Sequence, residues 1–559
     1  MLRDTSTVSV LVVGGGINGA AIFRDLSLQG IDVLLVDKSD FSSGTSSSTS
    51  HMAHGGLRYL EYGDFRLVRE ALEERNCLLK TAPHYVVPLP TTIPIFKRFT
   101  GSFNAALRFF GIKTGNHNER GALLIKIGLM IYDFMARHTA IMSRHFFMSR
   151  KESLSQFPLL NPKIICTATY YDAFIITPER VCFEMICDTI SNDEKSQAIN
   201  YMSVCGASDE NVFLRDELTN EIHVIKPTLV VNAAGPWIDE VNRVMEYNSK
   251  FVRGSKGSHI VIDHKELRDA IDDHEIFFEN DDGRIVLICP FLDKILVGTS
   301  DLICDDYSSV SCTDEEIRYF IAMINKIFPT ICVTDSHIVF TFSGVRPLLH
   351  SESEDTSKWT RDHSLHISTS SVSLKFPIIT LAGGKWTTFR SFAAKVTDRV
   401  LESIGMKRLF NTESLCIGGG KDYPIGSNEE RSFLAKIQQD FGLDEVRSRV
   451  LYKRYGTKIV DIAVFLTNNG RWPDKSLEFH NDYTYAEIAY ITKFESVVRL
   501  DDLILRRTMM AMMGELTTNL ISELCQIVGE CLGWSDNTCS QEIDRMLSIL
   551  AEEHRVQLL

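Results

Sequence analysis

The sequence has no apolar run long enough to cross a bilayer, which takes about 20 consecutive apolar residues. Its best candidate, GALLIKIGLMIYDFMA from Gly121, is shorter and carries Lys126 and Asp133. We therefore predict a buried or interfacial helix there. The sequence also has no internal repeat and no low-complexity tract, which argues against solenoid and collagen-like folds.

Positive charge is not in excess either. The chain has 59 lysines and arginines against 73 acids, a formal net charge of −14. Proteins that bind nucleic acids non-specifically are usually basic, so we expect no nucleic-acid partner. An anionic ligand must therefore be held by a local group of cations.

Compact metal-binding spacings and CxxC pairs are absent, although the chain has 13 cysteines and 16 histidines. This absence argues against a zinc site. No secretory apolar segment precedes the first predicted strand, so we expect reduced thiols and a cytoplasmic location. The length of 559 residues predicts two or three domains.

The first part of the chain contains a nucleotide-binding pattern. An apolar run from Val8 to Val13 predicts a strand, and a helical pattern continues to Leu28. Between them stands GxGxxG, whose glycines allow a tight turn and a close approach of the backbone to a pyrophosphate at the helix N-terminus. A second apolar run ends in Asp37, where an acid binds a ribose hydroxyl and disfavours a 2′-phosphate. The residues of this pattern are Gly14, Gly16, Asn18, Gly19 and Asp37.

Two further strand-to-glycine turns occur much later, in TLVVNAAGPWIDEV near residue 230 and IITLAGGKWTTFR near residue 383. A nicotinamide dehydrogenase usually continues its nucleotide domain with alternating strands and helices. Here a serine- and threonine-rich loop begins at Ser39 instead. We therefore predict one nucleotide domain built from discontinuous segments, with a substrate domain inserted, and this arrangement favours FAD over NAD.

A series of motifs in one order resembles the FAD-dependent glycerol-3-phosphate dehydrogenases of the glycine-oxidase-like, or D-amino-acid-oxidase-like, flavoprotein superfamily. The motifs are LVVGGGINGAAIFRDLSLQG, HGGLRYLEYGDFRLVREALEER, APHYVVPLP, VVNAAGPW, GVRPL, TRDH and AGGKWTTFR. The resemblance runs from Val8 to about Arg390, and a helical C-terminal segment resembles the extra domain of that family.

This resemblance implies an α/β fold with three parts. A Rossmann-like FAD-binding domain is expected from the discontinuous segments 1–90, 165–250 and 340–412. An inserted α+β substrate-binding or cap domain is expected at 91–164 and 251–339, and an α-helical C-terminal domain at 413–559. In that last part, FESVVRLDDLILRRTMMAMM predicts that Asp501 and Asp502 lie at the start of an apolar helix and that its methionines pack in a core or an interface.

The resemblance also implies the site residues. Oxidation of a secondary alcohol needs a hydride acceptor, here N5 of FAD, a group that takes the hydroxyl proton, and donors for charge on oxygen. His259 and Arg346 are the expected catalytic residues; whether His259 carries the proton or orients the hydroxyl stays open. The expected ligands of the substrate phosphate are Arg58, Tyr59, Arg361, Lys385 and Thr387. The further expected FAD contacts are Thr45, Ser46, Ser47, His54, Gly55, Gly56, Gly235, Gly384 and Lys385, and no metal is expected.

Two positions depart from the family pattern. His51 stands where a lysine or arginine is usual, and Phe389 stands where a tyrosine is common. The first departure predicts an altered flavin potential or pocket charge, with His51 and His54 close to the flavin.

The sequence leaves two electron acceptors open. Segment 95–114 is basic, through Lys97, Arg98, Arg108 and Lys113, and its apolar residues have helical spacing. Such an element suits either a peripheral contact with the inner face of an anionic cytoplasmic membrane or packing on the protein itself. The first alternative predicts a quinone acceptor, and the second favours oxygen.

We thus expect oxidation of sn-glycerol 3-phosphate to dihydroxyacetone phosphate with electrons passed to a membrane quinone. The alternatives are an oxidase that reduces O2 to hydrogen peroxide, and a flavin-binding scaffold or sensor without turnover. A homodimer is a further possibility that the sequence leaves open.

Overall fold

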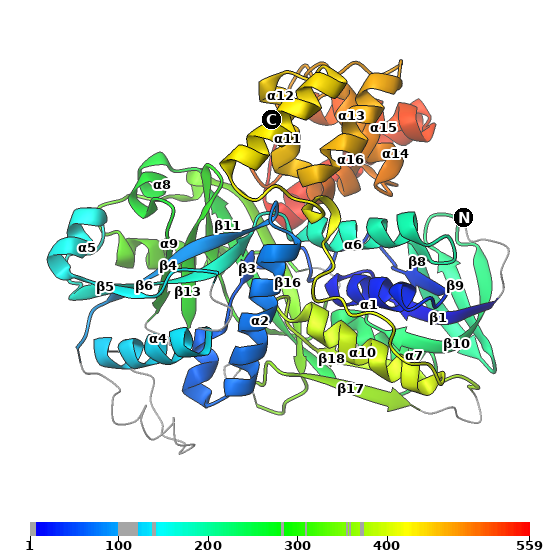
Figure 1. Cartoon of the computed structure of the whole chain (residues 1–559), viewed down its shortest axis with the longest axis horizontal. Coiled ribbons are helices and arrows are strands. Elements are labelled where there is room, and N and C mark those ends of the chain that lie inside the picture. The colour runs from blue at the N-terminus through cyan, green and yellow to red at the C-terminus, as the bar shows by residue number, and fades with distance from the viewer. Residues whose placement is uncertain are drawn as a thin grey trace.

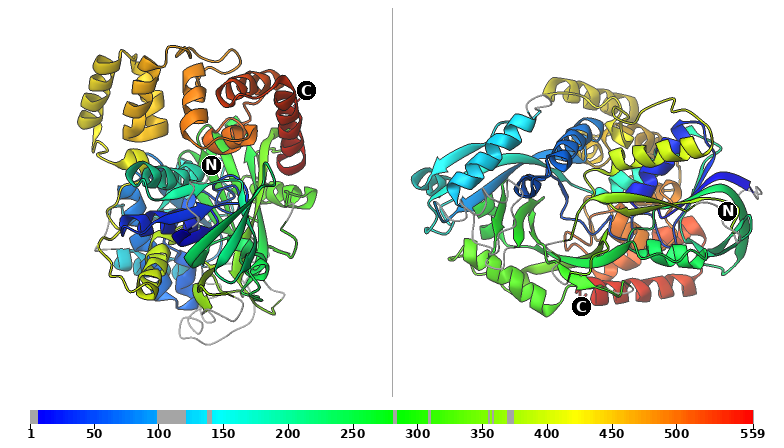
Figure 2. Two further views of the ribbon diagram at one scale, coloured as in Figure 1. Left: turned by 90° about the vertical axis from the view of Figure 1, so that its right-hand side faces the viewer. Right: turned by 90° about the horizontal axis from the view of Figure 1, so that it is seen from below.

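The computed structural model describes residues 7–98, 121–136, 141–280, 284–307, 310–353, 356, 359–368 and 374–558. Two large β-sheets with flanking helices form the body of the molecule, and a group of C-terminal helices lies on one side of it (Figure 1). The side view in Figure 2 shows the same arrangement.

The first sheet is mainly parallel and contains the glycine turns. Its strand order is β17-β18-β10-β1-β2-β7, and only β17 runs antiparallel to its neighbour along this path. The strands are β1 (Thr7–Val13), β2 (Val33–Val36), β7 (Gln197–Ile199), β10 (Ile222–Asn232), β17 (His363–Ser368) and β18 (Ile378–Gly383), and the hairpin β8 (Met202–Ser208) and β9 (Asn211–Asp216) extends from β10.

Alternating apolar residues give this sheet two buried faces. Val10 and Val12 pack with the helices α1 (Ile17–Leu28), α6 (Pro178–Asn192) and α10 (Phe389–Ser403). Leu11 and Val13 point to the other face, where β8, β9 and α7 (Ile238–Val244) cover them. Successive side chains of a strand point to opposite faces of the sheet. Because both faces are covered here, every residue from Val10 to Val13 is apolar, as in a central strand.

The second sheet has the order β15-β11-β14-β13-β12-β4-β6-β3, with β16 paired to β11 and β5 paired to β6. The strands are β3 (Met52–Ala53), β4 (Val86–Ile95), β5 (Phe146–Ser149), β6 (Cys166–Ile175), β11 (Val252–Ile262), β12 (Glu275–Glu279), β13 (Ile285–Phe291), β14 (Lys294–Gly298), β15 (Leu302–Cys304) and β16 (Ile338–Leu349). Its helices are η1 (Leu57–Tyr62), α2 (Phe65–Thr81), α4 (Ala122–Ala136), α5 (Arg150–Gln156), α8 (Lys265–Ile271) and α9 (Asp314–Ile327). The predicted helix after Gly121 is thus present as α4.

The C-terminal part is helical, as predicted. It contains α11 (Ser427–Phe441), α12 (Glu445–Tyr455), α13 (Ile459–Asn468), α14 (Tyr485–Phe494), the π-helix η7 (Asp502–Arg507), α15 (Thr518–Leu532) and α16 (Asp536–His554). Met510, Met512 and Met513 are buried in a core shared with Phe340 and Phe342 of β16, so the methionines do pack internally. These helices therefore rest directly on the second sheet.

The fold class expected from the resemblance is confirmed, whereas the domain boundaries remain a prediction. Sheet membership divides the chain somewhat differently from those boundaries. Strands β6 and β16 fall in the segments predicted for the FAD-binding domain, but they pair within the second sheet.

Candidate functional site

Three glycine turns meet at one edge of the first sheet. Strands β1, β10 and β18 are parallel neighbours, and each ends in one of the turns at Gly14, Gly235 and Gly384. Because the carboxyl ends of adjacent parallel strands lie at the same edge, residues separated by more than 350 positions become neighbours. This edge is where open α/β sheets bind ligands.

The first turn needs glycine at two positions for steric reasons. Gly14 has φ +106°, which side chains rarely adopt. A Cβ on Gly19 would lie 1.8 Å from the carbonyl oxygen of Gly14, so α1 packs against the turn too closely for any side chain. Gly16 precedes α1 and supplies no side chain to its N-terminus; Ser46 accepts from the N–H of Ile17, and the first turn of α1 contains no acid. The helix N-terminus therefore suits an anionic group such as a pyrophosphate.

Asp37 lies beside this turn, at the end of β2. Its carboxylate accepts hydrogen bonds from the N–H of Gly15 at 2.6 Å and of Ser39 at 2.9 Å. Burial raises the pKa of Asp37 to about 6, and the two N–H donors oppose this rise. A ribose hydroxyl that donated to this carboxylate would add a further partner at the position predicted for it.

The described residues fit a flavin dinucleotide. Beside the N-terminus of α1, Oδ1 of Asn18 is buried and has no hydrogen-bond partner among the described residues. A Cβ on Gly384 would meet Nδ2 of Asn18 at 3.3 Å, so Asn18 faces the third glycine turn. Buried polar groups are normally paired, and an unpaired amide oxygen beside a helix N-terminus without acids matches the polar atoms of such a cofactor.

The hydroxyl-rich loop after Asp40 links the two sheets. Thr45 donates from Oγ1 to the carbonyl oxygen of Val345 in β16 at 2.6 Å, and Ser46 accepts from the N–H of Ile17 at 2.9 Å. Ser47 instead donates to the carbonyl oxygen of Gly44. The loop thus runs between the glycine turn and the second sheet, and the predicted flavin contacts of all three residues remain predictions.

A buried ion pair that sequence reasoning missed fixes the Gly55-Gly56 turn. Asp172 in β6 accepts hydrogen bonds from the N–H of Gly55 at 2.9 Å, from Tyr132 at 2.6 Å and from Arg75 at 2.9 Å. A Cβ on Gly55 would lie 2.1 Å from the hydroxyl of Tyr132. The three side chains come from distant segments, so no local spacing pointed to them.

Lys385 and Tyr59 lie together next to this turn. The ammonium of Lys385 is 3.7 Å from the centroid of the Tyr59 ring, and Thr387 is buried nearby along the chain. Burial lowers the pKa of His54; Asp172 opposes that shift, while the positive charges of Lys385 and Arg361 add to it. The side chain of Arg58 lies outside the described part of the structure, so its predicted role stays a prediction.

Two predicted arginines share one carboxylate. Arg361 donates to Oδ2 of Asp301 at 3.2 Å, and Arg346 lies 3.5 Å from Oδ1. Burial would raise the pKa of Asp301, but the two guanidinium groups hold it below its usual value. Burial and the charge of Arg361 lower the pKa of Arg346 to about 10, which leaves it cationic at neutral pH. Asp301 thus holds two cations that would otherwise repel each other.

His259 lies in β11 close to these arginines. Its Nε2 forms a 2.8 Å hydrogen bond with the hydroxyl of Ser50, and its ring stacks on Phe342 with centroids 4.8 Å apart. Its Nδ1 is buried and has no hydrogen-bond partner. Burial, and then the charge of Arg346, lower the pKa of His259 well below its ordinary value. His259 is therefore a neutral imidazole at physiological pH.

The two departures from the family pattern are both buried. His51 contacts the rings of Phe174 and Phe291 and forms a hydrogen bond through Nδ1 with the carbonyl oxygen of Ile175. Burial lowers the pKa of His51 to about 4, so this position carries no charge at neutral pH. Phe389 packs edge-on against Trp386.

Five of the predicted residues lie near one another. Lys385 and Arg361 are close enough to His54 to influence its charge, as Arg361 is to Arg346 and Arg346 is to His259. Among the residues that the structure describes, no group of three or more histidines, cysteines or acids is arranged to hold a metal ion. Residues 99–114 of the predicted basic segment lie outside the described residues.

Comparisons with known proteins identify the family. The FAD-dependent oxidoreductase family matches residues 9–367, and the family described as the C-terminal domain of alpha-glycerophosphate oxidase matches residues 410–539. The glycerol-3-phosphate dehydrogenase of Synechocystis sp. is 30% identical over 566 aligned residues, which cover 97% of this chain and 96% of that protein. The aerobic glycerol-3-phosphate dehydrogenase of Staphylococcus aureus is 32% identical over 519 residues, 89% of this chain and 86% of that protein.

A solved structure has the same fold. The glycerol-3-phosphate dehydrogenase from Bacillus halodurans complexed with FAD superposes with a TM-score of 0.75 at 24% identity, over 98% of this chain and 95% of that one. The chain therefore belongs to the FAD-dependent oxidoreductase family and, within it, to the glycerol-3-phosphate dehydrogenases, and it is an enzyme whose cofactor is FAD.

Proposed function

We propose that this enzyme oxidises sn-glycerol 3-phosphate to dihydroxyacetone phosphate and passes the electrons to a membrane quinone. The observation that carries the substrate assignment is the buried ammonium of Lys385, which has no hydrogen-bond partner and lies in the same region as Arg361 and Arg346. Relatives that are named glycerol-3-phosphate dehydrogenases support the same substrate.

The phosphate is the group that these cations bind in the proposal. A phosphate monoester is close to dianionic at neutral pH, and arginine and lysine are its usual partners. Arg361 and Lys385 hold the phosphate, and Tyr59 and Thr387 add hydroxyl donors. Arg58 completes this predicted set. Since Asp301 already neutralises part of the charge of Arg361, the ammonium of Lys385 is the cation with the most to gain from the anion.

The hydroxyl of the substrate lies between Arg346 and His259 in this proposal. Bound FAD supplies the acceptor for the two electrons of the oxidation. His259 is neutral, so one ring nitrogen is free to accept the hydroxyl proton, and Ser50 is hydrogen-bonded to Nε2 for its onward movement. Arg346 remains cationic and stabilises negative charge that develops on the oxygen.

An exposed apolar face on α4 supports a quinone acceptor at a membrane surface. Leu123, Ile127, Met130 and Phe134 follow one face of the helix, and each is between 46% and 61% exposed. None of the described helices is both long and apolar enough to span a bilayer. We therefore propose that α4, with the basic segment before it, lies on the inner face of the cytoplasmic membrane. The alternative is an oxidase that transfers electrons to O2.

Anaerobic titration of the purified enzyme tests the substrate. Glycerol 3-phosphate should bleach the flavin absorbance near ~450 nm, as reduction of a flavin requires, whereas glycerol should leave it unchanged. If neither compound bleaches the flavin, the assignment of the phosphate site is wrong. Re-oxidation of the reduced enzyme by a soluble quinone or by air, followed at the same wavelength, then distinguishes the dehydrogenase from the oxidase.

Co-sedimentation with anionic phospholipid vesicles tests the membrane surface. Met130→Glu combined with Phe134→Glu should abolish sedimentation and slow quinone reduction, while flavin bleaching by substrate stays unchanged. Val446→Glu is the matched control, because Val446 is 74% exposed on α12, in the C-terminal helices. Unchanged sedimentation of the α4 variant would contradict the membrane contact and favour oxygen as the acceptor.

A further inference from the structure

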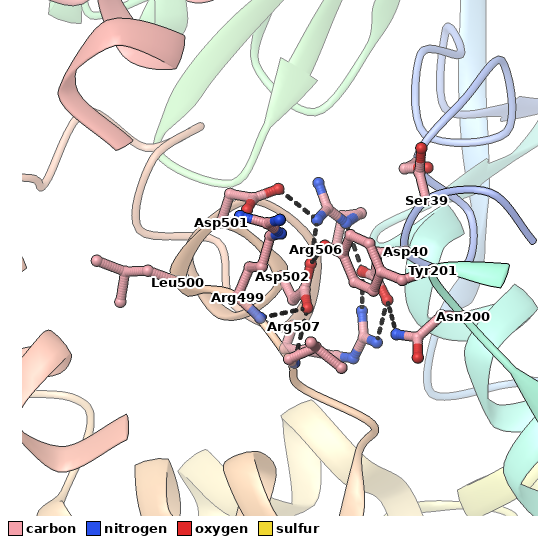
Figure 3. Close-up of polar contacts among 12 residues, drawn as sticks. Ser39, Asp40, Asn200, Tyr201, Arg499, Leu500, Asp501, Asp502, Arg506 and Arg507 are labelled. Atoms are coloured by element: carbon pink, nitrogen blue, oxygen red, sulfur yellow. Dashed lines mark hydrogen bonds and ion pairs between the residues drawn. The ribbon is translucent and has the colours of Figure 1, made fainter. Parts of the chain in front are cut away.

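A C-terminal segment reaches into the nucleotide-binding part of the molecule. Arg507 at the end of η7 makes a bidentate contact with Asp40, with 2.9 Å from Nη1 to Oδ2 and 2.9 Å from Nη2 to Oδ1 (Figure 3). Arg506 donates from Nε to Oδ2 of the same carboxylate at 2.5 Å. Asp40 is fully buried, and both arginines are buried too. Such charge-assisted bonds fix both position and orientation.

The same arginines are held firmly within the C-terminal helices. Arg506 also donates to Asp501 at 2.7 Å and to Asp502 at 2.6 Å, and Arg507 donates from Nε to the carbonyl oxygen of Glu495. Asp501 and Asp502 do begin a helical segment, as the sequence predicts. However, the segment is a π-helix, and its acids bind buried arginines rather than acting only as terminal charges.

Asp40 belongs to a short segment that surrounds the glycine turn on three sides. Asp37 accepts from the N–H of Gly15, and Ser42 donates its own N–H to the carbonyl oxygen of Gly15 at 3.1 Å. The ring of Phe41 lies so close that a Cβ on Gly15 would be 2.6 Å from it. A displacement of Asp40 therefore moves residues that contact the glycine turn directly.

A second set of contacts ties the same segment to the C-terminal helices. The N–H of Tyr201 donates to the carbonyl oxygen of Ser39, and its hydroxyl donates to Asp502 at 2.6 Å. Asn200 donates to Oδ1 of Asp40 and to the carbonyl oxygen of Ser496, both at 3.0 Å. Each of these residues thus bridges the segment and the C-terminal helices.

The charges of Asp40 and its two arginines also affect the pKa of Asp37. The negative charge of Asp40 contributes to the raised pKa of Asp37, after the larger effect of burial. Arg506 and Arg507 oppose that influence because they balance the charge of Asp40 at contact distance. An Asp40 carboxylate without its arginines would favour protonation of the acid expected to bind the ribose.

We propose that Arg506 and Arg507 are positioning residues for the FAD site, so that docking of the C-terminal helices on Asp40 and binding of FAD stabilise each other. The C-terminal helices then act on the cofactor site through the segment that carries Asp40. Since linkage is reciprocal, loss of the Asp40 contact weakens FAD binding, and FAD binding tightens the contact.

Reconstitution of deflavinated full-length enzyme with FAD tests this proposal. Asp40→Asn keeps the shape of the side chain but removes its charge, and we expect the Kd of FAD to rise about 10-fold or more, as loss of a charged hydrogen bond implies. Glu487→Gln is the matched control, because Glu487 is fully buried, pairs with Arg447 and Arg454 inside the C-terminal helices, and makes no hydrogen bond to Asp40 or its arginines among the described residues. With FAD saturating, the KM for glycerol 3-phosphate should change less than about 2-fold in both variants, because the substrate groups are untouched.

Two outcomes decide between positioning and a merely structural role. A larger Kd of FAD for Asp40→Asn than for Glu487→Gln, at equal loss of thermal stability, supports positioning. An equal effect of both variants on the Kd overturns it. If Asp40→Asn does not fold, Tyr201→Phe removes the contact to Asp502 and keeps the N–H bond to Ser39, and the same comparison with Glu487→Gln applies.

Hydrogen exchange on the unmodified protein gives an independent readout. Addition of FAD to the apoenzyme should slow exchange of the N–H groups of Val498 and Arg499, which donate to Asp502 at 2.8 Å and 2.9 Å. The amides of α15 serve as the internal control, because none of the described hydrogen bonds of Asp40 involves that helix. Equal protection of both regions by FAD overturns the proposal.

Discussion

Replacement of Lys385 by methionine should weaken substrate binding and stabilise the protein at the same time. The ammonium of Lys385 is buried and has no hydrogen-bond partner in the described structure. A buried charge without a partner lowers the stability of the folded protein, whereas the same charge strengthens the binding of a dianionic ligand. Methionine keeps the length of the side chain and removes only the charge. The two effects therefore have opposite signs.

The expected magnitudes follow from the surroundings of Lys385. A hydrogen bond to a charged group contributes about 1.5–3 kcal/mol, so the Kd of glycerol 3-phosphate should rise roughly 10- to 150-fold. An unsatisfied buried donor costs about 1–3 kcal/mol, and more if it is charged. The contact with the Tyr59 ring at 3.7 Å offsets about 0.5–2 kcal/mol of that cost. The free enzyme should therefore gain on the order of 1 kcal/mol in stability.

Anaerobic flavin titration measures the Kd, and thermal unfolding of the substrate-free enzyme measures the stability. Lys395→Met is the matched control, because Lys395 lies in α10, about half exposed, and pairs with Glu70. That variant should alter neither the Kd nor the flavin spectrum. An unchanged Kd for Lys385→Met, or a clear loss of stability, would refute the reasoning, because either result means that the ammonium already has a partner.

Three further changes test other parts of the site and of the fold. Arg361→Ala should raise the Kd of glycerol 3-phosphate about 10-fold or more, as loss of a charged donor implies, and leave the Kd of FAD nearly unchanged; equal losses in both titrations would contradict its assignment to the phosphate. Gly19→Ala should abolish retention of FAD, measured from the visible spectrum after gel filtration, because the added Cβ would lie 1.8 Å from the carbonyl oxygen of Gly14. Burial raises the pKa of Glu275 to about 8, well above its ordinary value of 4.5, so the folded protein holds a proton that the unfolded chain has lost, and stability falls as the pH rises from about 4.5 to about 8. Glu275→Gln should flatten this decline in the melting temperature between pH 5 and pH 9, and an unchanged slope would mean that Glu275 is already ionised at low pH.

The strand-turn-helix unit of the predicted nucleotide site was predictable because its information is local. Gly14, Gly19 and Asp37 stand within one strand-helix-strand unit, whose spacing is set by the geometry of a single turn. The later turns at Gly235 and Gly384 were predictable as turns, but their meeting depends on which strands become neighbours. That order follows from the packing of the whole sheet rather than from any one segment.

The supporting residues of the substrate half were not predictable in this way. Arg346 and Arg361 were expected from the resemblance, yet nothing in the sequence pointed to Asp301, which lies between them. Asp172 and Arg75 form a buried pair across 97 positions of the chain. Isolated charged residues of this kind look like surface residues until tertiary packing buries them together.

In the proposed reaction, the cations that bind the substrate also control the proton acceptor, His259. In the free enzyme, burial and the charge of Arg346 lower the pKa of His259, so its imidazole is neutral but a weak proton acceptor. The proposed substrate brings a dianion to Arg361 and Lys385, and Arg361 itself influences Arg346. An anion at these groups reduces the positive potential around His259 and thereby raises its affinity for a proton. In this proposal, the binding event that anchors the phosphate also makes His259 a better acceptor for the hydroxyl proton, so the cations and the buried histidine act together.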